Sequence, residues 1–300
     1  WLNSTSVTYI SEGNTATRTT TIPTTTTAFY PHMNSYQTTT LEVDFVFFRK
    51  YAATEPSIAS PTNEEKSQGP VAYWKFDEGQ GITTNNSGNG GSSLNGTITG
   101  ATWQTENQCI SGKCLYFDGT TSVVTTTTNN IIGTGTAPFS ASLWFKSTKT
   151  LTDGQWYFPI RLKQTTQFFF SFYQTGGSFY ALPVFRGSTQ WGTAIDQSTI
   201  VNKWNHLEVI YNGGDKSTAS SYETYINGVK IATGSTSFGT AGGSCNDNAI
   251  GSDADASCVN NMGLLKGFID DVKVYNYARS AAQIKSDFAS KGSGSVKGTS

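Results

Sequence analysis

The sequence predicts an all-β fold: two antiparallel sheets packed as a sandwich, with one short helix near the C-terminal end. Short segments of alternating apolar and polar residues recur from residue 71 onward. Gly and Asn separate them, a spacing typical of sandwiches. A single segment, 280–288, shows apolar residues at helical spacing. Aromatic residues make up 13% of the chain and supply the apolar area that a core between two sheets requires.

Composition divides the chain into four parts. Residues 1–60 are rich in Thr, Ser and β-branched residues and include one alternating segment, 41–48. We therefore expect a Thr-rich N-terminal β segment that belongs to a larger domain. Residues 61–70 contain two prolines and a charge cluster, which are typical of a linker. The sandwich is expected over 71–290, and a flexible Gly/Ser tail over 291–300.

Strands are expected where apolar and polar residues alternate. The pattern predicts strands at 71–76, 139–146 and 204–211. Within the last of these, Leu207, Val209 and Tyr211 share one face. The phenylalanine run at 168–170 indicates a strand that is covered on both faces.

A hairpin and a helix complete the predicted elements. Asn227-Gly228, within 225–231, is the preferred two-residue hairpin turn, because both positions of that turn need a positive φ. In 280–288, positions 281, 284, 285 and 288 fall on one helical face.

The charge balance excludes several classes of protein. The 300 residues carry 20 basic and 21 acidic side chains. Nucleic-acid binding needs clustered Lys and Arg, and binding to an anionic membrane surface needs a polybasic segment. No apolar run approaches the ~20 residues of a membrane-spanning helix. We expect no nucleic-acid partner and no membrane insertion within this chain. Residue 1 is Trp, so we also expect a processed chain or a fragment.

Four cysteines form two local pairs, Cys109 with Cys114 and Cys245 with Cys258. Both pairs lie in loop-like sequence of a chain rich in Thr, Ser and Asn, which favours disulfides formed outside a reducing cytosol. Zinc is the alternative, but there is no C-x₂-C knuckle, and neither histidine lies near a cysteine in sequence. We expect two disulfides and an extracellular or cell-surface location.

Seven short segments follow one another in the order found in one known family. They are 73–79 (YWKFDEG), 86–88 (NSG), 114–119 (CLYFDG), 139–145 (FSASLWF), 204–207 (WNHL), 225–228 (YING) and 267–276 (GFIDDVKVYN). Together they resemble the laminin-G-like, concanavalin A-like jelly roll of microbial surface proteins. The resemblance implies a jelly-roll sandwich with a concave face, a fold that hosts lectins, glycan-binding modules and some glycoside hydrolases. Residues 45–56 also resemble the end of a β-rich module that precedes such domains.

Catalytic residues are not evident. Glycosidases need two carboxyl groups that face one cleft, and the resemblance implies that hydrolases of this fold take them from a strand reading Glu-x-Asp-x-(x)-Glu. The nearest segment, 42–47, has Phe47 in place of the last acid and precedes the sandwich. No G-x-S-x-G elbow exists, and His206 lies mid-strand, where a structural imidazole is the better interpretation. We predict no catalytic residue and a protein that is not an enzyme.

Asp270 is the candidate centre of a calcium site. It alternates with Val272 and Val274, so we expect its carboxylate to face the apolar side of its strand. That position is costly unless the carboxylate is paired or bound to a cation. The resemblance implies a structural Ca²⁺ near this position, with Asp77 and Asp118 as partner ligands. Backbone carbonyls would complete the ~6–8 oxygens that the ion prefers. A hydrogen-bonded buried Asp270 is the alternative.

Aromatic residues beside turn-like sequence are candidate sugar contacts, because Trp and Tyr rings are amphipathic and can stack on the apolar face of a sugar. Trp156 and Tyr157 follow an Asp-Gly-Gln segment, Tyr180 follows a Gly-Gly-Ser turn, and Trp191 precedes Gly192. We predict Trp191, Trp156, Tyr157 and Tyr180 as ligand contacts.

The function predicted from the sequence is a non-catalytic extracellular surface module for adhesion or carbohydrate binding, with a glycan or another surface protein as partner. The alternative is a structural subunit of an extracellular filament or surface layer. In that case the N-terminal β segment would pair with the strand edge of a neighbouring chain. Asn3, Asn85 and Asn95 begin N-glycan acceptor triplets, although this number is close to chance in such a chain.

Overall fold

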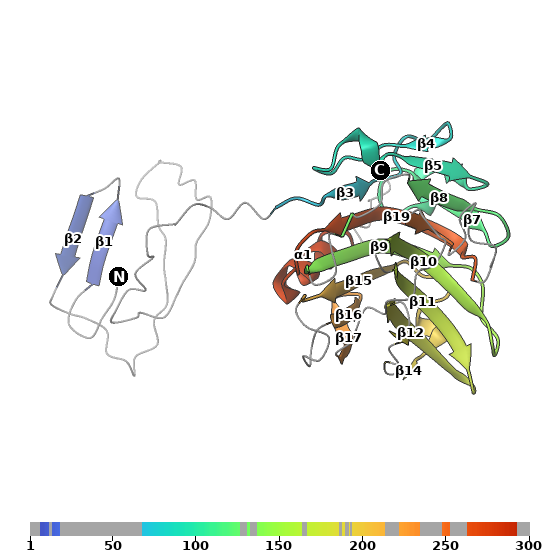
Figure 1. The fold of residues 1–300 in the computed structure, drawn as a ribbon. Helices are drawn as coiled ribbons and strands as arrows, with labels where there is room; N and C mark the ends of the chain where they lie inside the picture. Colours follow the sequence, from blue (N-terminus) through green and yellow to red (C-terminus); the bar gives the residue numbers. More distant parts are fainter. Residues whose placement is uncertain are drawn as a thin grey trace. The chain divides into compact units, whose positions relative to one another are not determined.

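The computed structural model divides the chain into two compact units, Trp1–Glu65 and Lys66–Ser300. It describes residues 7–11, 14–18, 68–126, 131–132, 137–163, 167–185, 188–189, 192, 194–213, 222–234, 248–252 and 263–292. In the first unit the described part is one hairpin, in which β1 (Val7–Ser11) pairs antiparallel with β2 (Asn14–Arg18) (Figure 1). The strand expected at 41–48 and the resemblance at 45–56 lie outside the described residues.

The second unit is a sandwich of two antiparallel sheets with one C-terminal helix, which confirms the predicted fold class (Figure 1). Sheet I has the strand order β17 (Val229–Gly234), β16 (Tyr222–Ile226), β15 (Asn205–Tyr211), β9 (Phe139–Ser147), β19 (Lys266–Tyr275), β7 (Cys114–Asp118) and β6 (Thr102–Gln104), and β3 (Ala72–Trp74) also pairs with β19. Sheet II has the order β13 (Ser188–Thr189), β12 (Ser178–Phe185), β11 (Gln167–Thr175), β10 (Trp156–Lys163), β18 (Asn248–Ile250), β8 (Val123–Thr126), β5 (Gly96–Thr99) and β4 (Thr83–Thr84), and β14 (Ala194–Ile195) also pairs with β12.

Short 3-10 turns lie between some of these strands, at Ser92–Leu94 (η1), Glu106–Gln108 (η2) and Gln197–Thr199 (η3). The predicted hairpin is present: Ile226 pairs with Val229, and Asn227 and Gly228 have φ values of 53° and 73°. The predicted strand at 71–76 is shorter than expected, because only β3 is paired and Phe76 takes a left-handed φ of 58°.

The core lies between the two sheets, where the alternation of each strand places one set of side chains. Aromatic rings from both sheets meet around Phe172 of β11. Its ring centroid lies 5.0 Å from that of Phe145 in sheet I, and 4.9 Å and 5.5 Å from those of Tyr157 and Phe179 in sheet II. All four side chains are buried. These contacts join the sheets into one apolar core.

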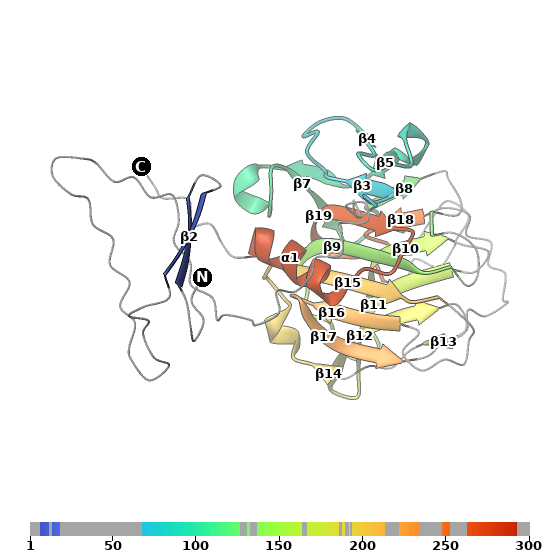
Figure 2. The ribbon, with the colours of Figure 1, turned by 90° about the vertical axis from the view of Figure 1, so that its left-hand side faces the viewer.

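Helix α1 (Ala281–Gly292) covers part of the outer face of sheet I, over β15 (Figures 1 and 2). Ser280 and Gln283 form a reciprocal cap at its start: Ser280 N–H donates to Gln283 Oε1 (2.8 Å), and Gln283 N–H donates to Ser280 Oγ (3.3 Å). Ile284 is fully buried against Ile210 and Tyr225 of the sheet. The helix continues beyond the predicted 280–288.

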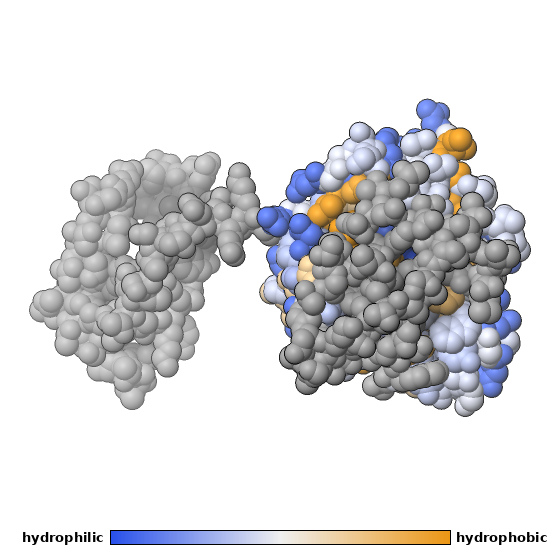
Figure 3. All heavy atoms as spheres, viewed as in Figure 1, coloured by the Kyte–Doolittle hydropathy of each residue, from blue (hydrophilic) through white to orange (hydrophobic). Residues whose placement is uncertain are grey.

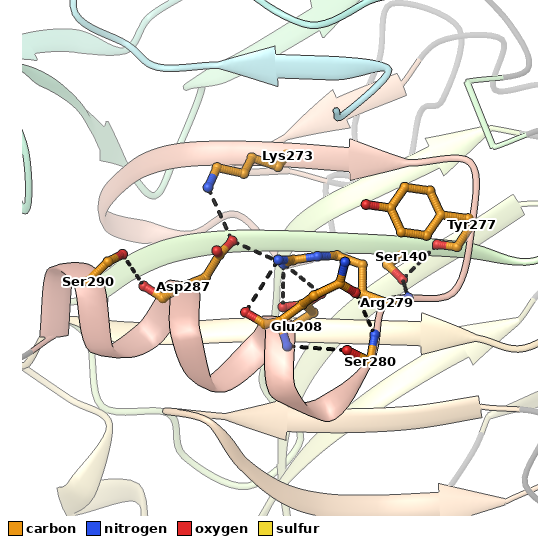
Figure 4. A network of polar contacts seen from close by, with 9 residues as sticks. Ser140, Glu208, Lys273, Tyr277, Arg279, Ser280, Asp287 and Ser290 are labelled. Atoms are coloured by element: carbon orange, nitrogen blue, oxygen red, sulfur yellow. Dashed lines mark hydrogen bonds and ion pairs between the residues drawn. The ribbon is translucent and has the colours of Figure 1, made fainter. Parts of the chain in front are cut away.

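A network of ion pairs and hydrogen bonds between charged side chains links this helix to sheet I (Figure 4). Arg279 Nη1 lies 3.2 Å from each carboxylate oxygen of Glu208 and 3.0 Å from Asp287 Oδ2. Lys273 of β19 also contacts Asp287, at 3.3 Å. The guanidinium lies over the ring of Tyr275, 4.5 Å from its centroid. Glu208 is fully buried and Arg279 nearly so, so the network is largely shielded from water.

Glu208 gives the sandwich an expected pH dependence. Burial raises the pKa of Glu208 from 4.5 to about 7, although the Arg279 guanidinium opposes that rise. Across this range the folded protein keeps a proton that the unfolded chain has released. The contribution of Glu208 to the free energy of unfolding is therefore fully present below pH 4.5, the ordinary pKa of the group. It is lost as the pH rises to about 7, the pKa in the folded protein. We expect Glu208→Gln to remove about 3 kcal/mol of this decline, measured by urea unfolding.

Glu223→Gln is the control for that measurement, because Glu223 is a half-buried acid on the adjacent strand β16. The decline assigned to Glu208 should persist in this variant, because Glu208 is unchanged there. An unchanged pH profile in Glu208→Gln would contradict the assignment to Glu208.

Candidate functional site

Three aromatic side chains form a row across sheet II. Trp156 of β10 pairs in register with Tyr173 of β11, which pairs with Tyr180 of β12. Because neighbouring residues Phe172 and Phe179 point into the core, the alternation of the strands directs the row to the outer face. All three rings are half-buried. We call these three residues the aromatic row.

Stacking orders the Trp156 end of the row. The centroids of Trp156 and Tyr173 lie 3.7 Å apart, with 19° between the ring planes. Phe158, two positions along β10, lies parallel to Trp156 at 6.0 Å. Its backbone N–H donates to Gly263 O (2.8 Å), which ties β10 to the segment before β19. The rings therefore hold one another in place before any ligand arrives.

Two turns place polar groups beside the row. The turn before β10 contains Asp153, and the hairpin between β11 and β12 contains Gly176 and Gly177, with φ values of 57° and 76°. Gly177 N–H donates to Asp153 Oδ1 (3.2 Å), so an exposed carboxylate joins the two turns. Aromatic faces with a few polar groups at their edge suit ligands that have both apolar and hydroxylated surfaces.

The rest of the described surface offers little for a purely apolar partner. Ile82 and Val229 are its exposed large hydrophobic side chains, and in Figure 3 the coloured face is mainly hydrophilic with scattered hydrophobic residues. The aromatic row therefore differs from the surface around it by the chemistry of its rings and not by general hydrophobicity.

The structure brings together two of the four predicted ligand contacts. Trp156 and Tyr180 belong to the aromatic row, whereas Trp191 lies outside the described residues. Tyr157 was predicted wrongly: it is 1% exposed and points into the core, because it follows Trp156 in the same strand. Tyr173 was missed. Its alternation in β11, together with the Gly-Gly hairpin that pairs it with Tyr180, could have identified it.

A bulge in β19 changes the direction of Asp270. The register between β19 and β9 shifts between Asp270 and Lys273, and Asp271 has a left-handed φ of 49°. A bulge inverts the alternation, so Val272 stays in the core while Asp270 lies on the outer face. There Ser111 N–H donates to its Oδ2 (3.1 Å). The expectation that Asp270 faces the apolar side was wrong. Burial still raises its pKa to about 8.

The Cys109–Cys114 disulfide is confirmed, and its loop supplies hydrogen-bond donors to two acids. Besides the contact with Asp270, Lys113 N–H donates to Asp77 Oδ1 (2.9 Å). Gly112 has a φ of 53°, and a Cβ at that position would collide with the same Asp77 oxygen. The second predicted disulfide, Cys245–Cys258, lies outside the described residues.

The three aspartates predicted to hold calcium are not gathered at one point. Asp118 is engaged in its own turn, where its carboxylate accepts hydrogen bonds from Thr120 and Thr121. Burial opposes the effect of these bonds, which nevertheless lower the pKa of Asp118. Over the described part of the chain, no three His, Cys, Asp or Glu side chains form a group that could hold a metal ion. Calcium binding stays a prediction, without the predicted ligand set.

The remaining candidate residues are placed as follows. Asn85 is exposed and Asn95 half-buried, and Asn95 Nδ2 donates to Asn85 Oδ1 (3.3 Å); Asn3 lies outside the described residues. His206 is 3% exposed, and burial lowers its pKa to about 3, as expected of a structural imidazole. Within the segments that the structure describes, there is no helix of the length and apolarity needed to cross a membrane.

Comparison with known proteins is consistent with this fold. One family model, that of the concanavalin A-like lectin/glucanases superfamily, matches residues 118–285. No curated protein matches the chain. Similar solved structures include the binding domain of paraclostridial mosquitocidal protein 1 (15% identity, TM-score 0.53, 74% of this chain and 52% of that chain). Another is the binding domain of botulinum neurotoxin DC in complex with rat synaptotagmin II (15% identity, TM-score 0.50, 74% of this chain and 51% of that chain). A third is Trypanosoma rangeli sialidase in complex with sialic acid (12% identity, TM-score 0.51, 75% of this chain and 33% of that chain).

These likenesses concern the fold. The identities are low, and the chain spans about half the length of the two toxin binding domains and about a third of the sialidase. The family match begins at Asp118, whereas the sandwich in the structure already includes β3 at Ala72.

Proposed function

The chain belongs to the concanavalin A-like lectin/glucanase superfamily, and on this premise we propose that it is a non-catalytic carbohydrate-binding module of an extracellular surface protein. The observation that carries the proposal is the aromatic row of Trp156, Tyr173 and Tyr180. The Cys109–Cys114 disulfide supports a location outside a reducing compartment.

The spacing of the row suits a short oligosaccharide. Adjacent strands lie about 4.7–4.9 Å apart, so the three positions span roughly 10 Å of the sheet. The Trp156 ring is stacked on Tyr173 and parallel to Phe158, so a sugar would contact the part of the Trp156 ring that stays exposed and the outer edges of the two tyrosines. The Asp153 carboxylate beside the row would accept hydrogen bonds from sugar hydroxyls.

The placement of the acidic groups supports a binding role without catalysis. A glycosidase needs a carboxyl group with a raised pKa beside a second carboxylate. Glu208 and Asp270, whose pKa values are raised by burial, lie on sheet I, covered by α1 or the disulfide loop. Near the row, a hydrogen bond from Ser198 N–H lowers the pKa of Asp196, which therefore stays ionised.

The test is glycan binding by the full chain. An array of neutral and sialylated oligosaccharides identifies the ligand, and titration calorimetry then measures its affinity. We expect Trp156→Ala to weaken binding at least tenfold, about 1.4 kcal/mol, because the ring contributes the largest stacking surface of the row. We also expect no release of reducing sugar from any bound glycan.

Trp103→Ala is the matched control. Trp103 is likewise a half-buried tryptophan in a strand, but it lies on β6 of sheet I, where its indole N–H donates to Gly81 O (2.8 Å). Its variant should bind as tightly as the unmodified protein. The proposal fails if folded wild-type protein retains no glycan, or if Trp156→Ala binds with unchanged affinity.

A further inference from the structure

A lysine and an aspartate meet where the end of α1 lies against β19. Lys291 Nζ is in direct contact with Asp271 Oδ2. The Asp271 side chain is 3% exposed and the Lys291 side chain 26% exposed, so the pair is largely removed from water. Asp271 occupies the bulge of β19, where its left-handed backbone aims the carboxylate. Strained backbone of this kind occurs often at sites of chemistry.

The groups around the pair fix the orientation of the aspartate. Tyr73 Oη donates a hydrogen bond to Asp271 Oδ1 at 2.5 Å. This contact leaves Oδ2 directed at the lysine. Asp271 Oδ2 and Asp270 Oδ1 are both buried. The partner of Asp271 Oδ2 is the Lys291 ammonium, whereas Asp270 Oδ1 has no hydrogen-bond partner among the described residues. A buried carboxylate oxygen without a hydrogen-bond donor, next to a buried ion pair, is costly and requires an explanation.

We propose that Lys291 and Asp271 form an intramolecular isopeptide bond. The neutral amine of Lys291 attacks Cγ of Asp271, the Nζ–Cγ bond forms, and the Cγ–Oδ2 bond breaks. Before the attack, one proton moves within the ion pair from the Lys291 ammonium to the Asp271 carboxylate. Oδ2 then leaves as water with two protons, one from this neutral carboxyl group and one from the attacking amine. The reaction therefore balances without an oxidant, a reductant or an external group. Asp270 relays the proton from the amine to the leaving oxygen.

The bond replaces the buried ion pair with a neutral amide and gives Asp270 Oδ1 a hydrogen-bond donor. Asp271 Oδ2 departs with the water, and the new amide N–H donates to Asp270 Oδ1. The amide oxygen, which was Oδ1 of Asp271, keeps the hydrogen bond from Tyr73 Oη. Asp270 directly precedes Asp271 in β19, and its carboxylate is near enough to Lys291 to act on the pKa of the amine. Burial lowers the pKa of Lys291 and so favours the neutral amine that the attack needs.

A second lysine–aspartate pair in the same region, Lys273 with Asp287, differs from the Lys291–Asp271 pair. Lys273 Nζ lies 3.3 Å from Asp287 Oδ2, an ordinary ion-pair distance. That oxygen is shared with Arg279 at 3.0 Å, and, although burial acts in the opposite direction, the two cations lower the pKa of Asp287. A carboxylate held between two cations stays ionised and does not accept an amine. The amide is therefore expected at Lys291 and Asp271 and not at Lys273 and Asp287.

Intact mass of the full chain, reduced so that disulfides do not contribute, tests the proposal. We expect a mass below that of the sequence by one water molecule. After tryptic digestion, peptide 267–273 should be recovered joined to peptide 286–297, uncleaved at Lys291. Lys291→Arg keeps the charge but cannot form the amide, so its mass should equal that of its sequence. Asp270→Asn keeps both reacting groups and should slow formation, leaving a mixture of bonded and unbonded chains.

Lys285→Arg is the matched control, because Lys285 is an exposed lysine on the same helix. It should show the same loss of one water as the unmodified protein. A wild-type chain at its full sequence mass, with a folded near-ultraviolet circular dichroism spectrum, would overturn the proposal. So would a loss of water that persists in Lys291→Arg. Neither outcome depends on whether the protein binds a glycan.

Discussion

Replacing Arg279 with alanine should lower the free energy of unfolding of the sandwich by about 3–5 kcal/mol. The guanidinium contacts both oxygens of fully buried Glu208 and also Asp287. Without it, Glu208 remains in the interior with no cation beside it, and that desolvation penalty dominates the loss. The variant also loses the contact with the Tyr275 ring. Urea unfolding followed by tryptophan fluorescence measures the change.

The destabilisation by Arg279→Ala should also depend on pH. Since a protonated Glu208 carries no charge, we expect Arg279→Ala to be less destabilising at pH 5 than at pH 8. Lys285→Ala, on the exposed side of the same helix, should change stability by no more than about 0.5 kcal/mol. Equal losses for Arg279→Ala at both pH values would show that packing, and not the buried charge, causes the destabilisation.

Phe172→Ala should be comparably severe, at about 3–5 kcal/mol. The ring is fully buried and contacts aromatic rings from both sheets, including Phe145 and Tyr157. Its removal leaves a cavity at the centre of the core, which the rigid strands around it cannot fill. Thermal unfolding with calorimetric detection measures the loss.

Phe169→Ala is the matched control, with the same residue type in the same strand β11. Phe169 is half-buried on the outer face, where its edge meets Phe158. We expect a loss less than half as large, because part of that ring is already in water. Equal losses in the two variants would contradict the assignment of Phe172 to the inward face of β11 and of Phe169 to its outward face.

The two-sheet fold was predictable because strand alternation and turn chemistry are local. The Asn227-Gly228 hairpin and the inward set of Leu207, Val209 and Tyr211 follow from neighbouring residues alone. The family resemblance was confirmed by the match over 118–285. Such features need no knowledge of which strands pair.

The site was harder to predict because it depends on pairing between strands. Tyr173 joins Trp156 and Tyr180 only through the registers of β10, β11 and β12, which alternation within one strand does not specify. The outward direction of Asp270 depends on a bulge beside a residue, Asp271, whose left-handed backbone has no glycine to mark it in the sequence.

The attachment of both flanking segments to β19 has a mechanical consequence. The chain enters the sandwich at β3, which pairs with Val272–Val274 of β19, and leaves it through α1, which Lys273 of β19 holds through Asp287. Tension applied through these two segments would pass from β3 to β19 to α1 and would load only one region of sheet I. The aromatic row on sheet II would lie off this load path and keep its shape while the protein is under force.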